Sequence, residues 1–184
     1  MSPGHIVLLN GPSSAGKTAL SKALAGSLPT PWLVMAVDLF HHIRSRPEPE
    51  LTREQWQRVF QQTRSAYHRA LAGAALAGCD VIGDHVLSEP WRLAELLDLT
   101  DGLDVLLIHV TCEVDELERR ERQRGDREGG TARAQADVAF AHGDFDLAVD
   151  TTHATPEACA ARVMGLLTSP PKQTAFQRLR LVAP

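Results

Sequence analysis

The stretch GPSSAGKT at residues 11–18 has the composition and spacing of a phosphate-binding loop, Gly11-x4-Gly16-Lys17-Thr18. The two glycines permit turns that aim successive backbone N–H groups at an anion. Lys17 is expected to reach the β- and γ-phosphates of ATP, and Thr18 to offer its hydroxyl to Mg²⁺. The residues predicted to bind the nucleotide here are Gly11, Pro12, Ser13, Ser14, Ala15, Gly16, Lys17 and Thr18. The alternative interpretation is a chance Gly/Ser turn before a helix.

Two aspartates end apolar runs that have the pattern of strands. Asp38 ends residues 32–38 and could orient or deprotonate an acceptor hydroxyl near the γ-phosphate. Its alternative role is an N-cap for a helix starting at Leu39. Asp84 ends VIGD and could hold Mg²⁺ or position the acceptor, or it could cap a turn. Asp38 and Asp84 are therefore candidate acceptor-binding residues, and Thr18 and Asp84 candidate metal ligands.

Arginines gather around RGDREGG at residues 124–130. Three of them follow an acidic residue by four positions, as on a solvated helix: Arg119 after Asp115, Arg120 after Glu116 and Arg122 after Glu118. Arg124 and Arg127 lack such a pairing and flank glycines. We expect these two to act as catalytic arginines in a lid at about residues 124–131, which closes over the phosphates and excludes water. The alternative is a plain solvated helix.

Histidines and aromatic residues add weaker signals. The eight histidines suggest no metal cluster by their spacing. His41 follows Asp38 closely, so it is a candidate acceptor contact or a solvated residue. Trp56, Phe60 and Tyr67 share a helical stripe that favours core packing, although its first turns could wall an acceptor pocket.

The elements that must position these residues alternate along the chain. Strands are expected at residues 5–11, 32–38, 79–86, 103–112 and 145–152. Helices are expected at residues 17–28, 52–77, 89–98, 113–124, 131–141 and 156–167. This order predicts βαβ units and an α/β fold with a parallel sheet covered on both faces. Residues 1–168 would form the domain, and residues 169–184 a C-terminal extension, either loose or docked on the body or a partner.

Length and composition exclude several classes of protein. The chain has 184 residues, enough for one ordinary domain, and its net charge of −4 does not indicate a nucleic-acid partner. No apolar run approaches the roughly 18 residues of a membrane span, and the N-terminus lacks a signal-peptide pattern. The three cysteines are far apart and are expected to be small buried residues. A cytoplasmic location is expected.

The remaining residues discriminate among users of a phosphate loop. We find no NKxD loop that would read guanine and no DxxG segment after a strand, which argues against a GTPase. The chain is short for a motor or a large ATPase. A compact kinase with a small hydroxylated acceptor is therefore favoured. An acceptor such as a sugar or nucleoside, and an ATP-binding regulatory module without transfer, are the alternatives. The oligomeric state stays open, with a homo-oligomer as one option.

The chain resembles the chloramphenicol phosphotransferase-like kinases in LLNGPSSAGKT, PWLVMAVD, VIGDHVL, GLDVLLIHVTC, RERQRGDREGGTARAQ and FDLAVDTTHATPEACA. The resemblance implies a nucleotide-kinase-like three-layer fold with strand order 2-3-1-4-5. It implies transfer of the ATP γ-phosphate to a hydroxyl, with Asp38 as the base and Arg124 and Arg127 in the lid. It also implies that Thr152 and Pro156 contact the nucleotide base.

The acceptor-side segment, residues 39–56, is shorter than in the resembled family and carries Arg44, Arg46 and Arg53. A chloramphenicol-like acceptor and an antibiotic-inactivating role are one option, and a more polar or anionic acceptor is another. The phosphate loop thus predicts the donor, while residues 39–56 are expected to determine the acceptor.

Overall fold

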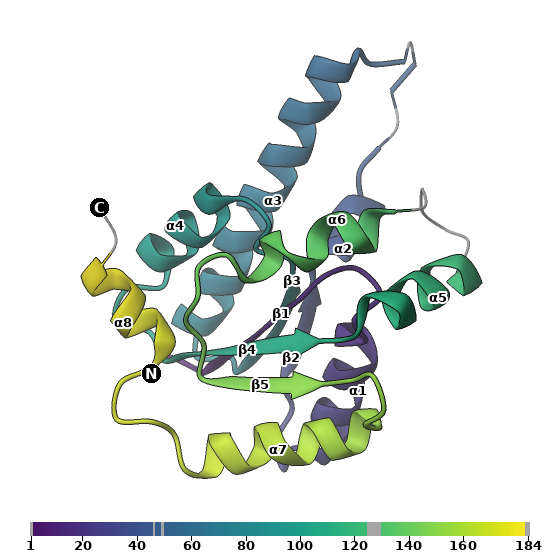
Figure 1. The fold of residues 1–184 in the computed structure, drawn as a ribbon. Helices are drawn as coiled ribbons and strands as arrows, with labels where there is room; N and C mark the ends of the chain where they lie inside the picture. The colour runs from purple at the N-terminus through teal and green to yellow at the C-terminus, as the bar shows by residue number, and fades with distance from the viewer. Residues whose placement is uncertain (1, 46, 49, 125–129, 183–184) are drawn as a thin grey trace.

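The computed structural model describes residues 2–45, 47–48, 50–124 and 130–182. Within these residues, parallel strands form one sheet in the order β2-β3-β1-β4-β5 (Figure 1). The strands are β1 (Ile6–Asn10), β2 (Leu33–Ala36), β3 (Val81–His85), β4 (Val105–Thr111) and β5 (Leu147–Asp150). The structure therefore confirms the predicted α/β class and strand order.

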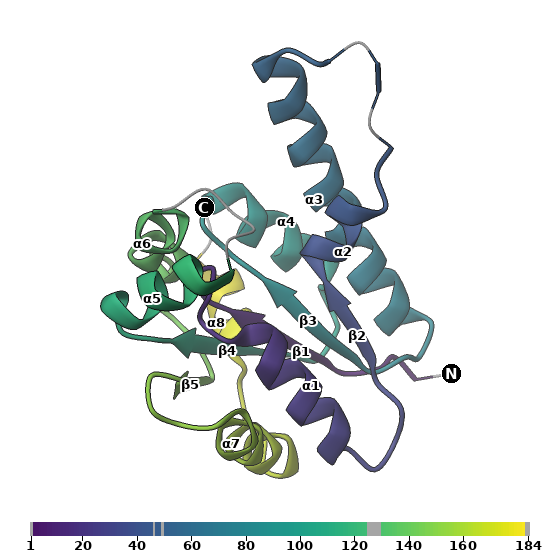
Figure 2. The same ribbon diagram turned by 90° about the vertical axis from the view of Figure 1, so that its right-hand side faces the viewer.

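Helices cover both faces of this sheet, as Figures 1 and 2 show. One face carries α1 (Lys17–Ser27) and α7 (Pro156–Thr168), and the other carries α3 (Arg53–Leu76), α4 (Pro90–Leu99) and α8 (Ala175–Val182). Along β1, Leu8 packs in the core under α3, α4 and α8, whereas Leu9 packs in the core under α1 and α7. A strand buried on both faces explains why β1 is a continuous apolar run rather than an alternating one.

Short helices lie beyond the carboxyl ends of the strands (Figure 1). They are α2 (Val37–His42), α5 (Val114–Arg124), α6 (Thr131–Ala136) and the 3-10 helix η1 (Val138–Phe140). The single helix predicted at residues 131–141 is thus two short helices that meet at Asp137. Ligands of parallel α/β sheets bind at this edge, so these helices are placed to wall a site.

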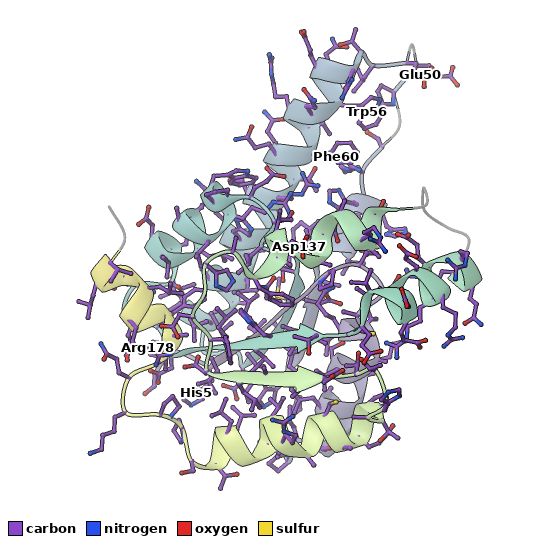
Figure 3. All side chains as sticks on the ribbon, viewed as in Figure 1. His5, Glu50, Trp56, Phe60, Asp137 and Arg178 are labelled. Atoms are coloured by element: carbon purple, nitrogen blue, oxygen red, sulfur yellow. The ribbon has the colours of Figure 1, made fainter. Side chains whose placement is uncertain are left out.

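The first half of α3 extends away from the sheet (Figure 1). A capping box starts the helix, because Thr52 accepts from the Gln55 backbone while the Gln55 side chain accepts from the Thr52 backbone. Trp56 and Phe60 lie on this projecting part (Figure 3) and remain outside both cores, whereas Tyr67 is fully buried. Core packing, predicted for the whole aromatic stripe, therefore holds only for its inner end.

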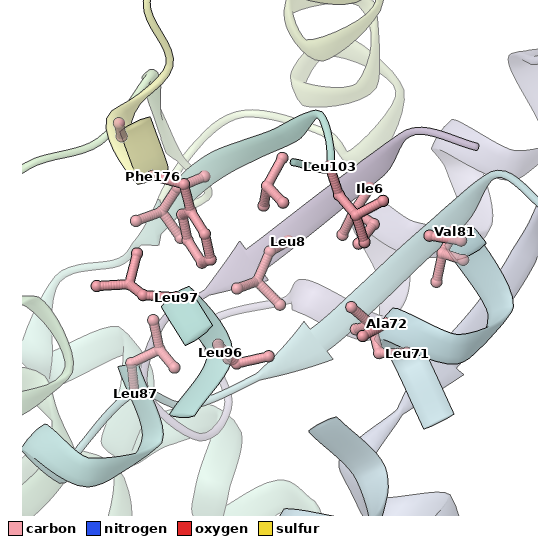
Figure 4. Packing of buried hydrophobic residues seen from close by; sticks show 14 of the residues in the cluster. Ile6, Leu8, Leu71, Ala72, Val81, Leu87, Leu96, Leu97, Leu103 and Phe176 are labelled. Atoms are coloured by element: carbon pink, nitrogen blue, oxygen red, sulfur yellow. The ribbon is translucent and has the colours of Figure 1, made fainter. Parts of the chain in front are cut away.

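The C-terminal segment docks on the body of the protein. Phe176 of α8 is fully buried and packs in the same core as Leu97 and Leu103 (Figure 4). The backbone N–H of Ala175 donates to Asp146 over 2.7 Å, and the Arg178 guanidinium binds the carboxylate of Asp144. Of the options left open by the sequence, docking on the body is the one observed.

Two further features of the described residues are the exposure of the cysteines and the character of the helices. Only Cys159 is buried, Cys112 is half-buried and Cys79 is exposed, so the prediction of three buried cysteines is wrong for Cys79. Cys79 lies between the turn that ends α3 and the start of the buried strand β3. None of the described helices has the length and apolar character that a membrane span requires.

Candidate active site

The loop between β1 and α1 depends on glycine at two positions for two different reasons. A Cβ atom at Gly11 would lie 2.3 Å from the carbonyl oxygen of Val110, so a side chain there would collide with β4. Gly16 has a φ of 84°, in the left-handed region that glycine enters without steric cost. The glycines predicted to permit turns therefore serve close strand packing at Gly11 and a left-handed turn at Gly16.

Two elements distant in sequence fix this loop. The Thr151 hydroxyl, just after β5, donates to the carbonyl oxygen of Ala15 over 2.8 Å. The backbone N–H of Ser13 donates to the Gln135 side chain of α6, also over 2.8 Å. The loop is thus tied to the end of β5 and to α6.

Lys17 and Thr18, at the start of α1, meet Asp84 of β3 at the carboxyl edge of the sheet. The Lys17 ammonium donates to the carbonyl oxygens of Gly11 and Pro12 over 2.9 Å and lies 3.8 Å from Oδ1 of Asp84. The Thr18 hydroxyl donates to Oδ2 of Asp84 over 2.9 Å. The Asp84 carboxylate therefore contacts both a cation and a hydroxyl at the start of α1.

Strand register places Asp84, and Asp38 follows the neighbouring strand. Asp84 lies beside Leu9 of β1 and Ala36 of β2. Strand β2 ends at Ala36, so Asp38 lies in the first turn of α2 instead of ending the strand. The N-cap is Ala36, so the capping alternative for Asp38 is wrong as well. The strand is shorter than predicted because its last apolar residue, Val37, already has helical geometry.

A cavity of about 390 Å³ joins the two aspartates to the phosphate loop. The sequence-predicted residues that line it are Ser13, Ser14, Gly16, Lys17, Thr18, Asp38, Asp84 and Arg124. Arg120 and Gln123 complete its wall from α5. Since Arg120, Gln123 and Arg124 are three and four residues apart, they share one face of that helix. This cavity is the candidate active site.

Arg120 is a site residue that the sequence analysis missed. Its spacing to Glu116 predicted a solvated ion pair, and that pair exists, with Nε 2.7 Å from the carboxylate. The same guanidinium also donates to the Thr151 carbonyl oxygen over 2.7 Å. The only sequence signal was its position four residues before Arg124. Arg127, the second predicted lid arginine, lies outside the described residues, as does most of the predicted lid.

Glu121 holds the start of α6 against α5. Its carboxylate is buried and accepts the backbone N–H groups of Gly130 over 2.8 Å and Ala132 over 2.9 Å. These N–H groups are among those that a helix start leaves without an intrahelical partner. One side chain of α5 therefore anchors the helix that contacts the phosphate loop through Gln135.

A second, smaller cavity of about 260 Å³ adjoins the phosphate loop behind Gly16. Pro156 lines it together with Ala154, Thr151 and Arg120. Thr152, which the sequence analysis grouped with Pro156, instead accepts the backbone N–H of Glu113 over 3.0 Å and donates to Asp150 over 2.6 Å. Among the described wall residues, Thr151 thus stands where Thr152 was expected.

His41 belongs to a third cavity, of about 840 Å³, between α2 and the projecting part of α3. Its described wall includes His41, Arg44, Arg53, Trp56 and Phe60. The His41 ring packs edge-on against Phe60, with centroids 5.5 Å apart. The structure therefore does not bring His41 into the wall of the cavity that holds Asp38 and Asp84.

The donor atoms near the phosphate loop suit Mg²⁺. This cation prefers oxygen ligands and binds nucleotide sites through one or two protein groups, keeping several waters. The Thr18 hydroxyl and the Asp84 carboxylate, 2.9 Å apart, supply such a pair. The described residues contain no cluster of three or more His, Cys, Asp or Glu that would form an all-protein metal site. Thr18 and Asp84 would hold the ion next to the nucleotide phosphates.

Comparison with known families identifies relatives over nearly the whole chain. The family described as "Chloramphenicol phosphotransferase-like protein" matches residues 4–168. The chain belongs to this family. The protein "Putative O-phosphotransferase Rv2636" of Mycobacterium tuberculosis strain H37Rv is 30% identical to it over 201 residues, which cover 98% of this chain and 89% of that protein. The resemblance found in the sequence motifs is therefore confirmed.

Solved structures share the fold of this family member at low sequence identity. The Mycobacterium tuberculosis APS kinase CysC, in complex with AMPPNP and APS, matches with a TM-score of 0.66 and 16% identity, over 92% of this chain and 100% of that one. The Acinetobacter baumannii shikimate kinase matches with a TM-score of 0.60 and 14% identity, over 94% and 97%. These matches confirm the kinase-like fold.

Proposed function

We propose that the protein is an ATP-dependent O-phosphotransferase that moves the γ-phosphate of ATP to a hydroxyl group of a small molecule. The observation that carries this proposal is the single cavity lined by the phosphate loop, Asp38, Asp84 and the arginine face of α5. Family membership and the phosphotransferase names of the relatives support the same class of reaction. A nucleotide and its acceptor would meet in this cavity.

The acceptor hydroxyl would attack the γ-phosphorus while the bond from that phosphorus to the β,γ-bridging oxygen breaks and ADP leaves. Asp38 would orient the hydroxyl and take its proton. Lys17 and the arginines of α5 would neutralise the charge on the moving phosphoryl group. Mg²⁺, held by Thr18 and Asp84, would shield the negative charge of the phosphates. Such catalysis relies mainly on positioning and electrostatics because the transition state is loose.

The acceptor itself is proposed only by class. Chloramphenicol is one candidate, suggested by the family description, and its phosphorylation would inactivate an antibiotic. A sugar, a nucleoside or another hydroxylated metabolite is the alternative. The acceptor would enter beside Asp38, where the wall of the active-site cavity passes from the phosphate loop to α2.

Labelled ATP and a panel of hydroxylated compounds test this proposal, with Asp38→Asn compared against Lys17→Ala. Asp38→Asn should lower kcat by about 100-fold or more and leave the affinity for an ATP analogue unchanged, because only the proton acceptor is lost. Lys17→Ala should lower kcat and should also weaken the affinity for the ATP analogue. Unchanged transfer by Asp38→Asn would refute the role of that carboxylate. Binding of the ATP analogue without transfer to any compound would favour a regulatory ATP-binding module.

A further inference from the structure

Arg64 is a half-buried arginine to which the reaction proposed above assigns no role. It lies on α3 one turn closer to the sheet than Phe60, and its guanidinium carbon is 5.6 Å from the centroid of the Phe60 ring. Among the described residues, no hydrogen bond and no ion pair to Arg64 is formed. None of its side-chain nitrogens is among the buried polar atoms without a partner, so its N–H groups reach the surface, where a ligand can accept them. The site therefore has donor capacity that no described protein group fills.

A second guanidinium lies against the same ring. The guanidinium carbon of Arg44 is 4.8 Å from the centroid of Phe60 and 5.6 Å from that of Trp56. The two arginines come from different elements, Arg44 from just after α2 and Arg64 from the middle of α3. Phe60 thus gathers two positive charges at the junction of these helices, an arrangement that cation–π attraction supports.

Charges of both signs act on Arg64 at this junction. Arg92 is buried and committed to the Val86 carbonyl oxygen, the Ser88 hydroxyl and the Glu89 carboxylate. Burial, followed by the positive charge of Arg92, lowers the pKa of Arg64, and Arg44 acts in the same direction, whereas Glu89 and Asp38 oppose the shift. Three arginines, Arg64, Arg92 and Arg44, thus interact with two carboxylates in this group of charges.

We propose that the acceptor carries an anionic group, such as a carboxylate, sulfate or phosphate, in addition to the hydroxyl that is phosphorylated, and that Arg64 together with Arg44 binds this anion. This inference rests on the proposed phosphotransferase function and names its substrate class. The planar guanidinium matches the paired oxygens of such groups and can donate two hydrogen bonds to them. Phe60 and Trp56 would flank the bound anion and limit its access to water.

The short helix α2 gives this anion site a role in orientation, because Asp38 lies in its first turn and Arg44 follows its end. Asp38 also lines the cavity that contains Lys17. An anion held at Arg64 would fix one end of the acceptor while Asp38 engages its hydroxyl at the other. Two fixed points orient a small molecule better than one, and orientation is a main source of rate in phosphoryl transfer.

Matched acceptor pairs test the proposal with the full-length protein, ATP and Mg²⁺. Each pair consists of a hydroxy acid and its uncharged amide: glycerate and glyceramide, 3-hydroxypropionate and 3-hydroxypropionamide, quinate and quinamide. We expect transfer to favour the acids. Arg64→Gln should raise the KM for a preferred acid by about 10- to 100-fold, the loss expected for one hydrogen bond to a charged group, with the KM for ATP unchanged. Arg64→Lys should retain part of the affinity.

Arg58→Gln is the matched control, because Arg58 is an exposed arginine of the same helix. Equal effects of Arg58→Gln and Arg64→Gln would overturn the proposal. A preference for the amides that Arg64→Gln leaves unchanged would overturn it too, while the phosphotransferase function stands. Absence of transfer to every hydroxylated compound, despite binding of the ATP analogue, would instead count against the function.

A binding measurement tests the anion site without requiring transfer. AMPPNP and Mg²⁺ first occupy the phosphate loop, and calorimetry then follows sodium sulfate, with sodium chloride at equal ionic strength as reference. Sulfate should bind the wild type and Arg58→Gln alike and bind Arg64→Gln at least about tenfold more weakly. Equal affinity for all three proteins, or no sulfate binding by the wild type, would overturn the anion site.

Discussion

The Thr18 hydroxyl donates a 2.9 Å hydrogen bond to Oδ2 of Asp84, and so joins the first turn of α1 to β3. The same carboxylate has Lys17 3.8 Å from its other oxygen. One aspartate therefore contacts both Lys17, which is expected to reach the phosphates, and Thr18, which is expected to bind Mg²⁺. This contact makes Asp84 the residue through which β3 influences the donor side of the reaction.

Replacement of Asp84 by Asn should lower kcat by about 100-fold and raise the Mg²⁺ concentration needed for half-maximal activity, since a neutral amide is a poorer ligand for a hard cation. Thr18→Val should act in the same direction, and Thr18→Ser, which keeps the hydroxyl, should retain most of the activity. Initial rates over a Mg²⁺ titration measure both effects. A Mg²⁺ dependence that Asp84→Asn leaves unchanged would exclude its metal role.

Arg120→Ala should raise the KM for ATP by about tenfold, because it removes a charge from the cavity wall and the support of the Thr151 carbonyl behind the phosphate loop. Arg119→Ala is the matched control, since Arg119 binds the same Glu116 carboxylate from a more exposed position. Steady-state kinetics with varied ATP separate the two variants. If Arg120→Ala and Arg119→Ala had equal KM values for ATP, the role of Arg120 would be limited to a surface ion pair with Glu116.

Phe176→Ala should destabilise the protein by about 3–5 kcal/mol, the usual cost of removing a fully buried phenyl ring from a core. Leu181→Ala on the same helix should change stability by less than about 0.5 kcal/mol, because Leu181 is 76% exposed. Urea unfolding followed by circular dichroism gives both values. A small loss for Phe176→Ala would mean that α8 contributes little to the folded state in solution.

His109 should make the protein less stable in acid. Its ring is buried between Phe140 and Phe145, and burial, with His142 nearby, lowers its pKa to about 4. The unfolded chain, with a pKa near 6.5, binds more protons between these values. The contribution of His109 to the free energy of unfolding is therefore complete above about pH 6.5. It falls by about 2 kcal/mol between pH 7.5 and pH 5.

His109→Gln should remove this part of the pH dependence, whatever its effect at neutral pH. The free energy of unfolding should then drop by about 2 kcal/mol less than in the wild type over the same pH interval. His153→Gln, at an exposed position, should reproduce the wild-type pH dependence. Chemical unfolding at the two pH values gives the comparison, and parallel losses in wild type and His109→Gln would contradict it.

The strands and the phosphate loop could be predicted because their signals are local. A doubly buried strand such as β1 must be apolar throughout, and Gly16 is required by its own left-handed backbone. Asp38 shows the limit of such reasoning, since helical geometry already begins at Val37 within an apolar run. No pattern in residues 32–38 marks the position at which the extended backbone ends and the helix begins.

The parts that could not be predicted depend on contacts between distant segments. Arg120 fits a solvated ion pair by spacing, and only its contact with Thr151, 31 residues away, brings it into the site. Arg64 carries no mark in the sequence, because its contact with Phe60, and the lack of a hydrogen bond from it to any described residue, depend on how α3 packs. The docking of α8 likewise rests on Asp144 and Asp146, which precede β5 and are separated from α8 by β5 and α7.

The Glu121 carboxylate links two distant parts of the nucleotide side of the protein. It lies in α5 and accepts the backbone N–H groups of Gly130 and Ala132, so it holds the start of α6 against α5. Gln135 of α6 in turn accepts the backbone N–H of Ser13 in the phosphate loop. A change at Glu121 would therefore reach the phosphate loop through α6, although Glu121 makes no contact with that loop among the hydrogen bonds of the described residues.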